Sequence, residues 1–238
     1  MKRSADPRLN GQSPDTGMRK IPYDTQRFRF AEQLLAHFGW GLPLNQLHRW
    51  LSEDVPFFED KTHDQSTAIH KHFYSLYDGD SPFLELYHEF LREVVLPCVG
   101  EGIVFQAKPT FRICLPGNLA VGEWHKDSDY AHPRSELSWW LPLTDAYGTN
   151  TVWSETEEDK GDFQPIDVEF GEVLSWKSAV LQHGNKTNET GVSRVSIDFR
   201  VIPFKDYAAS SSASSHMNLK FEVGGYYGLM NDAGQVSF

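Results

Sequence analysis

The chain has 238 residues, of which 39% are hydrophobic and 13% aromatic, a composition typical of a folded globular protein rather than a disordered one. Its 33 acidic residues outnumber its 22 lysines and arginines, which gives a formal net charge of −11. This acidic balance argues against recognition of a phosphate backbone, so we expect no nucleic-acid partner.

Residues 1–22 are polar and have no apolar core of the kind found in secretory signals, and we expect them to form a flexible tail. Cys98 and Cys114 follow no metal-ligand spacing and are expected to be reduced thiols. No apolar run approaches the ~18 residues of a membrane span. The expected location is the cytoplasm, without a membrane partner, and the sequence does not indicate an oligomeric state.

Residues 23–100 show the spacing of amphipathic helices, with apolar side chains recurring every three or four positions. Three stripes follow this period, namely Phe30, Leu34 and Phe38; Ile69, Phe73, Leu76 and Tyr77; and Phe83, Leu86, Tyr87 and Phe90. The third predicted helix has clear boundaries. Ser81 can cap its amino end, Pro82 suits the first helical position, and Pro97 is expected to end it.

From residue 101 onward, short segments rich in Val, Ile, Phe and Trp alternate with turn residues. These predicted strands lie within 109–118, 135–143, 149–153, 171–184 and 193–203, with a last one around 219–228. Many short strands at close spacing predict a β-sandwich or barrel with the earlier helices packed on its outside. We therefore expect one domain over 23–238, made of a helical part (23–100) and a β part (101–238).

Two polar stretches interrupt this β part. The acidic run 154–162 (SETEEDKGD) and the Ser-rich stretch 208–216 are both expected to be surface loops.

Two histidines and an aspartate stand out in the β part. His125 and Asp127 lie two apart on an extended segment, so their side chains point the same way, and His183 ends an apolar strand. Two histidines and one carboxylate can occupy one face of a metal's coordination sphere and leave the opposite positions open, which is the usual site of non-haem Fe(II). These residues are candidate metal ligands.

Arg194 and Ser196 form a second candidate site on one face of a later strand. A guanidinium can bind a carboxylate through two hydrogen bonds, and a neighbouring hydroxyl adds a third. The pair therefore suits a dicarboxylate cosubstrate held near the metal.

The order His125-x-Asp127, His183, Arg194-x-Ser196 resembles that of the Fe(II)/2-oxoglutarate-dependent oxygenases. The stretches ELSWWLPLTDAYGTNTVW and GEVLSWKSAVLQHGN resemble strands of the phytanoyl-CoA-hydroxylase-like branch, and the chain is loosely similar to oxygenases of the streptomycin-biosynthesis type. The resemblance covers roughly residues 100–205. It implies a double-stranded β-helix, or jelly roll, flanked by N-terminal helices, with Fe(II), 2-oxoglutarate and O2 as cofactors. By this resemblance the catalytic metal ligands are His125, Asp127 and His183, and the 2-oxoglutarate-binding pair is Arg194 and Ser196.

The same resemblance implies oxidation of an unactivated C–H bond of a small molecule, with succinate and CO2 as coproducts. Halogenases of this superfamily carry a small residue in place of the carboxylate. The presence of Asp127 therefore favours hydroxylation, or another oxidation such as desaturation or ring formation.

Several alternatives remain open at this stage. Asp129 is a second candidate carboxylate, Arg200 shares the strand face of Arg194, and Arg112 and His132 could also reach the site. A cupin-like metal protein without oxygenase activity and a non-catalytic jelly-roll binding module are the other function classes. Five tryptophans are expected mainly in the core, with one or two lining the pocket: Trp124, Trp139, Trp140, Trp153 and Trp176.

Overall fold

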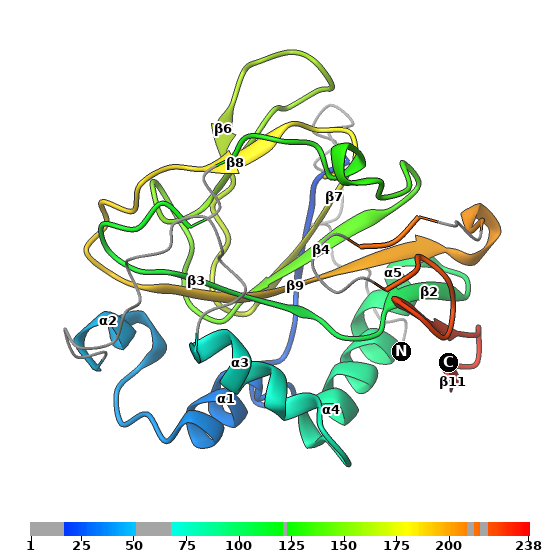
Figure 1. The fold of residues 1–238 in the computed structure, drawn as a ribbon, viewed down its shortest axis with the longest axis horizontal. Helices are drawn as coiled ribbons and strands as arrows, with labels where there is room; N and C mark the ends of the chain where they lie inside the picture. The colour runs from blue at the N-terminus through cyan, green and yellow to red at the C-terminus, as the bar shows by residue number, and fades with distance from the viewer. Residues whose placement is uncertain (1–16, 51–67, 121–122, 209–211, 215–218) are drawn as a thin grey trace, which may run out of the picture.

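A computed structural model describes residues 17–50, 68–120, 123–208, 212–214 and 219–238. Its strands form two antiparallel sheets, with helices on the outer face of the larger one and the smaller sheet on the other side (Figure 1). This mainly antiparallel β arrangement with added helices is the predicted fold class.

The larger sheet has the strand order β1-β7-β4-β9-β2-β10-β11, and β3 also pairs with β9. Its strands are β1 (Arg19–Pro22), β2 (Ile103–Gln106), β3 (Thr110–Cys114), β4 (Leu137–Pro142), β7 (Glu172–Trp176), β9 (Arg194–Pro203), β10 (Tyr227–Met230) and β11 (Val236–Ser237). The smaller sheet has the order β6-β5-β8, formed by β5 (Val152–Ser154), β6 (Gln164–Pro165) and β8 (His183–Asn185).

The helices pack mainly through the apolar stripes predicted from the sequence, and the fully buried Phe73, Phe83 and Phe90 lie in one core with the larger sheet. The α-helices are α1 (Phe30–Phe38), α2 (Leu47–Trp50), α3 (Ala68–Tyr74), α4 (Pro82–Phe90) and α5 (Leu96–Val99). Shorter helical turns are η2 (Leu44–Gln46), η3 (Ser75–Tyr77), η4 (Leu91–Val95), η5 (Asp127–Tyr130) and η6 (Phe204–Asp206).

The amino end of α4 forms as predicted, but its carboxyl end does not. Ser81 Oγ accepts a hydrogen bond from the Leu84 amide at 3.1 Å, and Pro82 occupies the first turn. The prediction that Pro97 ends the helix is wrong, because the chain stays helical to Val99. The π-helical turn η4 starts a new helical segment, and Pro97 falls in the first turn of α5, where its missing N–H costs little.

Successive side chains of strand β9 point alternately to the core that the sheet shares with the helices and to the interior of the jelly roll. Val195, Ile197 and Phe199 point into the core shared with the helices. From residue 194 to residue 200, the alternate positions of the strand, which face away from that core, are polar or charged: Arg194, Ser196, Asp198 and Arg200. A second apolar cluster, which includes Trp140 of β4 and Trp176 of β7, lies apart from the helix-packed core.

The structure differs from the sequence-based expectations at three places, namely β1, β2 and the last two strands. Residues 19–22, assigned to the flexible tail, form β1, because the free edge of β7 pairs with them and Ile21 packs on the core. Strand β2 was missed, since four residues buried on both faces show no alternation. The last strands, β10 and β11, begin near the end of 219–228 or beyond it.

Residues 1–16 and much of 208–216 lie outside the described residues. Cys98 and Cys114 are not joined in a disulfide bond. Within the described part of the chain, no helix is long and apolar enough to span a membrane.

Candidate metal centre and cosubstrate pocket

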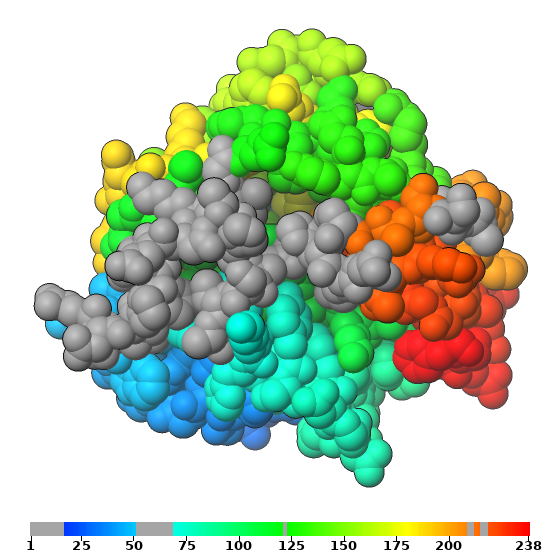
Figure 2. Space-filling model, viewed as in Figure 1, coloured from blue at the N-terminus to red at the C-terminus, as the bar shows by residue number. Residues whose placement is uncertain are grey.

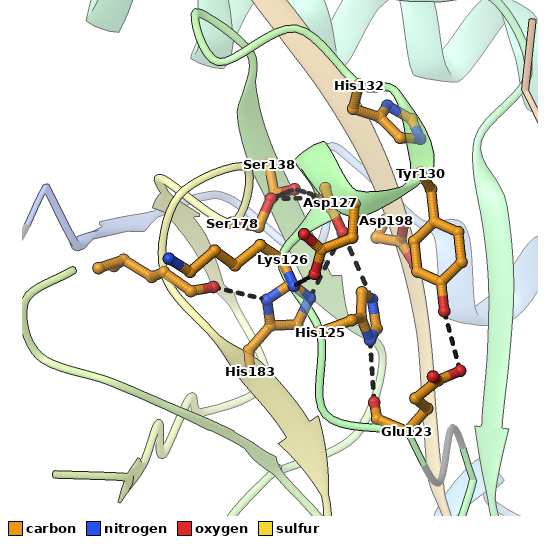
Figure 3. A network of polar contacts seen from close by, with 12 residues as sticks. Glu123, His125, Lys126, Asp127, Tyr130, His132, Ser138, Ser178, His183 and Asp198 are labelled. Carbon is orange, nitrogen blue, oxygen red and sulfur yellow. Dashed lines mark hydrogen bonds and ion pairs between the residues drawn. The ribbon is translucent and has the colours of Figure 1, made fainter. Parts of the chain in front are cut away.

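His125, Asp127 and His183 come together in the structure (Figure 3). The two histidines are paired through their backbones, since each amide donates to the other's carbonyl at 2.9–3.0 Å. Asp127 follows at the start of η5, and its Oδ1 lies 3.6 Å from His125 Nε2 and 3.5 Å from His183 Nε2. One ligand atom from each residue lies within 4.8 Å of the others, a spacing suited to one metal ion.

The histidines are held so that Nε2 faces the cluster. His125 Nδ1 lies 2.9 Å from the Glu123 carbonyl, and His183 Nδ1 lies 3.0 Å from the Leu181 carbonyl. A carbonyl can only accept, so each Nδ1 carries the proton and each Nε2 keeps a free lone pair. Metal-binding histidines are typically oriented in this way, so the donor set fits a divalent transition metal.

The second oxygen of Asp127, Oδ2, is occupied by protein donors. Arg200 donates to it from Nε and Nη2, both at 2.9 Å, and Ser178 Oγ donates at 2.7 Å. Ser138 Oγ lies 3.4 Å away and contacts Ser178 Oγ. Burial alone would raise the pKa of the Asp127 carboxyl, but the pKa is held well below its usual range, chiefly by the Arg200 guanidinium.

Arg200 and Arg112 share a second carboxylate, that of Asp198. Arg200 Nη1 lies 2.7 Å from Asp198 Oδ1, and Arg112 Nε donates to Asp198 Oδ2 at 3.0 Å. Burial raises the pKa of the Asp198 carboxyl, yet the two guanidinium groups lower it below its ordinary value. This side of the site is therefore a buried, charge-compensated network that ends on Asp127.

Arg194 is in a different situation, although it lies on the same strand face. Only 2% of its surface is exposed, and it donates to Ser196 Oγ at 2.9 Å and to the Asn150 carbonyl at 3.1 Å. Its guanidinium lies 5.6 Å from the ring centre of Trp140. Among the residues that the structure describes, no carboxylate forms an ion pair with Arg194. A buried guanidinium compensated only by neutral groups favours an anionic ligand.

One cavity joins the two arginine environments. Its lining includes residues from both, together with the two inner tryptophans, in the set Arg112, Ala120, Trp140, Val152, Trp176, Asn185, Arg194, Asp198 and Arg200. The expectation that one or two tryptophans line the pocket is therefore met by Trp140 and Trp176. The indole nitrogen of Trp176 is buried and has no hydrogen-bond partner among the residues that the structure describes.

The rival candidates lie elsewhere or have other partners. Asp129 is exposed, and its Oδ2 accepts from the Lys126 amide at 2.9 Å, which caps η5. His132 Nδ1 lies 2.6 Å from Glu136 Oε2, and its ring packs on Phe221. Neither residue belongs to the metal-type cluster.

The acidic run 154–162 is not the simple surface loop that its composition predicts. Glu155 is 2% exposed and accepts hydrogen bonds from the amides of Gly161 (2.9 Å) and Gln182 (3.0 Å). Asp159 forms an ion pair with Lys126 at 2.6 Å. The run thus contacts both segments that carry the cluster, and it forms the top of the molecule above the segment around His125 (Figure 2).

Sequence reasoning missed Ser138, Ser178, Glu136 and Glu155. Ser178 lies 51 residues from Asp127, and Gln182 lies 27 residues from Glu155. A lone serine or glutamate carries no local motif. The only available hint is the position of Ser138 beside the aromatic run of β4, where its small polar side chain interrupts an apolar strand.

No protein-family model matches the chain. Over 165 residues, which are 69% of this chain and 77% of the relative, it is 40% identical to the streptomycin biosynthesis protein StrG of Streptomyces griseus. The structure is similar to a non-haem monooxygenase, the ThoJ–nickel complex (TM-score 0.50, 16% identity, 83% of this chain and 78% of that one). It is also similar to AviO1 from Streptomyces viridochromogenes Tue57 (TM-score 0.50, 18% identity, 82% and 93%).

These likenesses confirm the resemblance inferred from the sequence and the jelly-roll fold class. The solved structures establish the fold, which the chain shares with the non-haem monooxygenase ThoJ and with AviO1. The sequence relative establishes kinship, and the chain belongs to the family of the streptomycin biosynthesis protein StrG.

Proposed function

We propose that the protein is an Fe(II)/2-oxoglutarate-dependent oxygenase that oxidises, most simply hydroxylates, a C–H bond of a small molecule. One observation carries the proposal: a cluster of two histidines and one buried aspartate lies beside the cavity of Arg194, a buried guanidinium paired only with neutral groups in the described chain. The first element suits the metal, and the second suits the far carboxylate of the cosubstrate.

The proposed metal ligands are His125 Nε2, His183 Nε2 and Asp127 Oδ1. Imidazole and carboxylate donors together suit Fe(II), and three ligands on one face leave room for other molecules to bind. When bound, Fe(II) would activate O2 for C–H oxidation while 2-oxoglutarate is converted to succinate and CO2. The chain's own part is to keep the three donor atoms in place and Nε2 deprotonated, which the carbonyls of Glu123 and Leu181 support.

Arg194 and Ser196 are proposed to bind the carboxylate of 2-oxoglutarate that is remote from the metal. Arg194 already donates to Ser196 Oγ, so the guanidinium and the hydroxyl are held side by side before any ligand arrives. Burial strengthens an ion pair in this pocket because water does not screen it. Trp140 and Trp176 add apolar walls that exclude water.

Arg200, the alternative cosubstrate arginine, is less suited to that role. Its Nε and Nη2 donate to Asp127, and its Nη1 donates to Asp198. An incoming carboxylate would have to displace these groups at a large electrostatic cost. This difference supports Arg194 as the cosubstrate ligand.

The substrate is proposed to be a small biosynthetic intermediate. The StrG relative is named for streptomycin biosynthesis, and 77% of its length is matched by this chain. The proposal extends to a substrate of that general kind and not to a particular compound.

The test is an anaerobic titration of the metal-free protein with Fe(II) and then 2-oxoglutarate, monitored by the weak visible charge-transfer band of a keto acid chelated on iron. We expect the band in the unmodified protein, its loss in His183→Ala, and a higher 2-oxoglutarate requirement in Arg194→Ala. Asp129→Asn is the matched control and should keep the band.

Other outcomes separate the alternatives. Iron binding without the band would favour a cupin-like metal protein, and no iron binding would favour a non-catalytic binding module. If the band forms, succinate release in the presence of O2 then screens candidate substrates.

A further inference from the structure

The two oxygens of Asp127 have separate surroundings. Oδ1 faces the two histidine Nε2 atoms at 3.5–3.6 Å and has no closer protein donor among the described residues. Oδ2 receives two donors of Arg200 and the hydroxyl of Ser178, all within 2.9 Å. An oxygen that already accepts three hydrogen bonds is a poor ligand for a metal, because coordination would displace or compete with them.

The groups that hold Oδ2 come from the larger sheet or directly follow one of its strands. Arg200 lies in the central strand β9, and Ser138 lies opposite it in the β4–β9 register. Ser178 follows the end of β7, and its carbonyl also accepts from the Asp127 amide at 3.0 Å. Asp127 itself belongs to the segment between β3 and β4, outside both sheets. The contacts therefore fix a ligand in a loop to the frame of the larger sheet.

Arg200 is in turn oriented by its neighbours. Asp198 lies two residues away on the same strand face and accepts from Arg200 Nη1 at 2.7 Å, while its other oxygen accepts from Arg112. With one edge of the guanidinium on Asp127 and the remaining nitrogen on Asp198, rotation of the Arg200 side chain would break both ion pairs. The arginine is thus locked in the orientation that engages Oδ2.

We infer that Arg200 is a positioning residue that makes Asp127 a one-oxygen ligand, with Asp198 setting the orientation of Arg200. This inference rests on the proposed function, since it assumes that Asp127 binds the metal. A carboxylate that offers one oxygen occupies one coordination position instead of two. Arg200 therefore preserves a position at the metal for the cosubstrate or O2, although it contacts neither.

The test uses Co(II) as the probe, because its affinity and its d–d absorption report on coordination without any turnover. Metal-free protein is titrated with Co(II) in the absence of 2-oxoglutarate. Arg200→Met is expected to bind Co(II) about 10- to 100-fold more weakly than the unmodified protein, as is typical when a group that orients a metal ligand is lost. Its d–d bands should also change, because Asp127 can then offer both oxygens.

Arg200→Lys retains the charge but not the pair of donors, and it should recover part of the affinity. Arg92→Met is the control, since it removes an arginine whose Nε donates to the Gly234 carbonyl, outside the candidate metal centre and the cosubstrate pocket. Its Co(II) affinity and bands should equal those of the unmodified protein.

Unchanged affinity and unchanged bands in Arg200→Met would overturn the inference. If circular dichroism shows that Arg200→Met is unfolded, Ser178→Ala is tested instead. Its affinity for Co(II) should fall by about three- to tenfold. An affinity equal to that of the unmodified protein would overturn the inference. Failure of the proposed function has a different signature. In that case the unmodified protein would not bind Co(II), or His183→Ala would bind it equally well.

Discussion

Arg194 and Arg200 lie on the same face of β9, the first buried and the second partly buried, yet their environments differ. Arg200 forms close ion pairs with Asp127 and Asp198 and lies 4.0 Å from the Glu136 carboxylate, whereas Arg194 contacts a hydroxyl and a backbone carbonyl. One end of the strand face is therefore charge-compensated by the protein itself, and the other has no acidic partner among the described residues. Burial and residue type alone do not distinguish a structural arginine from a ligand-binding one, but their partners do.

The largest expected effect comes from removing the compensated arginine. Arg200→Met leaves Asp127 and Asp198 buried without their shared cation, so the free energy of unfolding of the metal-free protein should fall by about 3 to 5 kcal/mol. Urea unfolding in the presence of a chelator measures this. A loss below about 1 kcal/mol would mean that the network contributes little to stability.

This destabilisation should depend on pH. In the unmodified protein the pKa values of Asp127 and Asp198 are lowered, so their contribution is present above the ordinary aspartate value of about 3.9 and is lost as pH falls through the lower folded values. In Arg200→Met the Asp127 carboxyl loses its main cation, so burial raises its pKa and protonation at acid pH stabilises the variant, while Asp198 keeps Arg112. The stability difference should shrink between pH 7 and pH 4, and urea midpoints at each pH test this. A constant difference would contradict it.

A smaller effect is expected for Asp198→Asn. The amide oxygen can still accept from one arginine, and Arg200 keeps Asp127, so the cost should be about 1 to 3 kcal/mol. Arg112 is partly exposed, and water compensates part of its lost ion pair. A cost as large as that of Arg200→Met would place Asp198, rather than Arg200, at the centre of the network.

The smallest effect on the ligand-free protein is expected for Arg194→Met. Two hydrogen bonds are lost, but a buried cation without an acidic partner in the described chain is also removed, so the net change should stay within about 2 kcal/mol. Ligand dependence should distinguish the variant. With iron present, 2-oxoglutarate at about 100 times its dissociation constant should stabilise the unmodified protein by about 2.7 kcal/mol and the variant far less. Equal thermal shifts in both would move the carboxylate site elsewhere.

Local sequence patterns were sufficient to predict part of the fold and part of the candidate site. The alternation in β9 assigned Arg194 and Ser196 to one face and the apolar residues to the other, and Ser81 with Pro82 located the start of α4. The H-x-D spacing and the later His183 predicted one cluster of metal ligands, and the three residues do lie together in the structure.

What the sequence could not supply depends on partners distant in the chain. Ser178 and Arg200 reach Asp127 only because β7, β4 and β9 are neighbours in the sheet. Glu155 is buried because two backbone amides need its carboxylate, although its acidic neighbours suggest full solvation. Pro97 is tolerated inside a helical stretch because η4 changes the hydrogen-bonding register, a feature with no sequence marker.

Strand β1 has a consequence for the association behaviour of the protein. It covers one edge of β7, whose inner residues Val173 and Leu174 are fully buried. The outer edge that β1 itself presents carries Arg19, Lys20 and Pro22, charged and proline residues that discourage further strand addition. A chain shortened to begin at residue 23 would uncover the apolar strand β7 and leave it open to pairing between molecules. By covering the edge of β7, strand β1 should therefore reduce aggregation through edge-to-edge strand pairing.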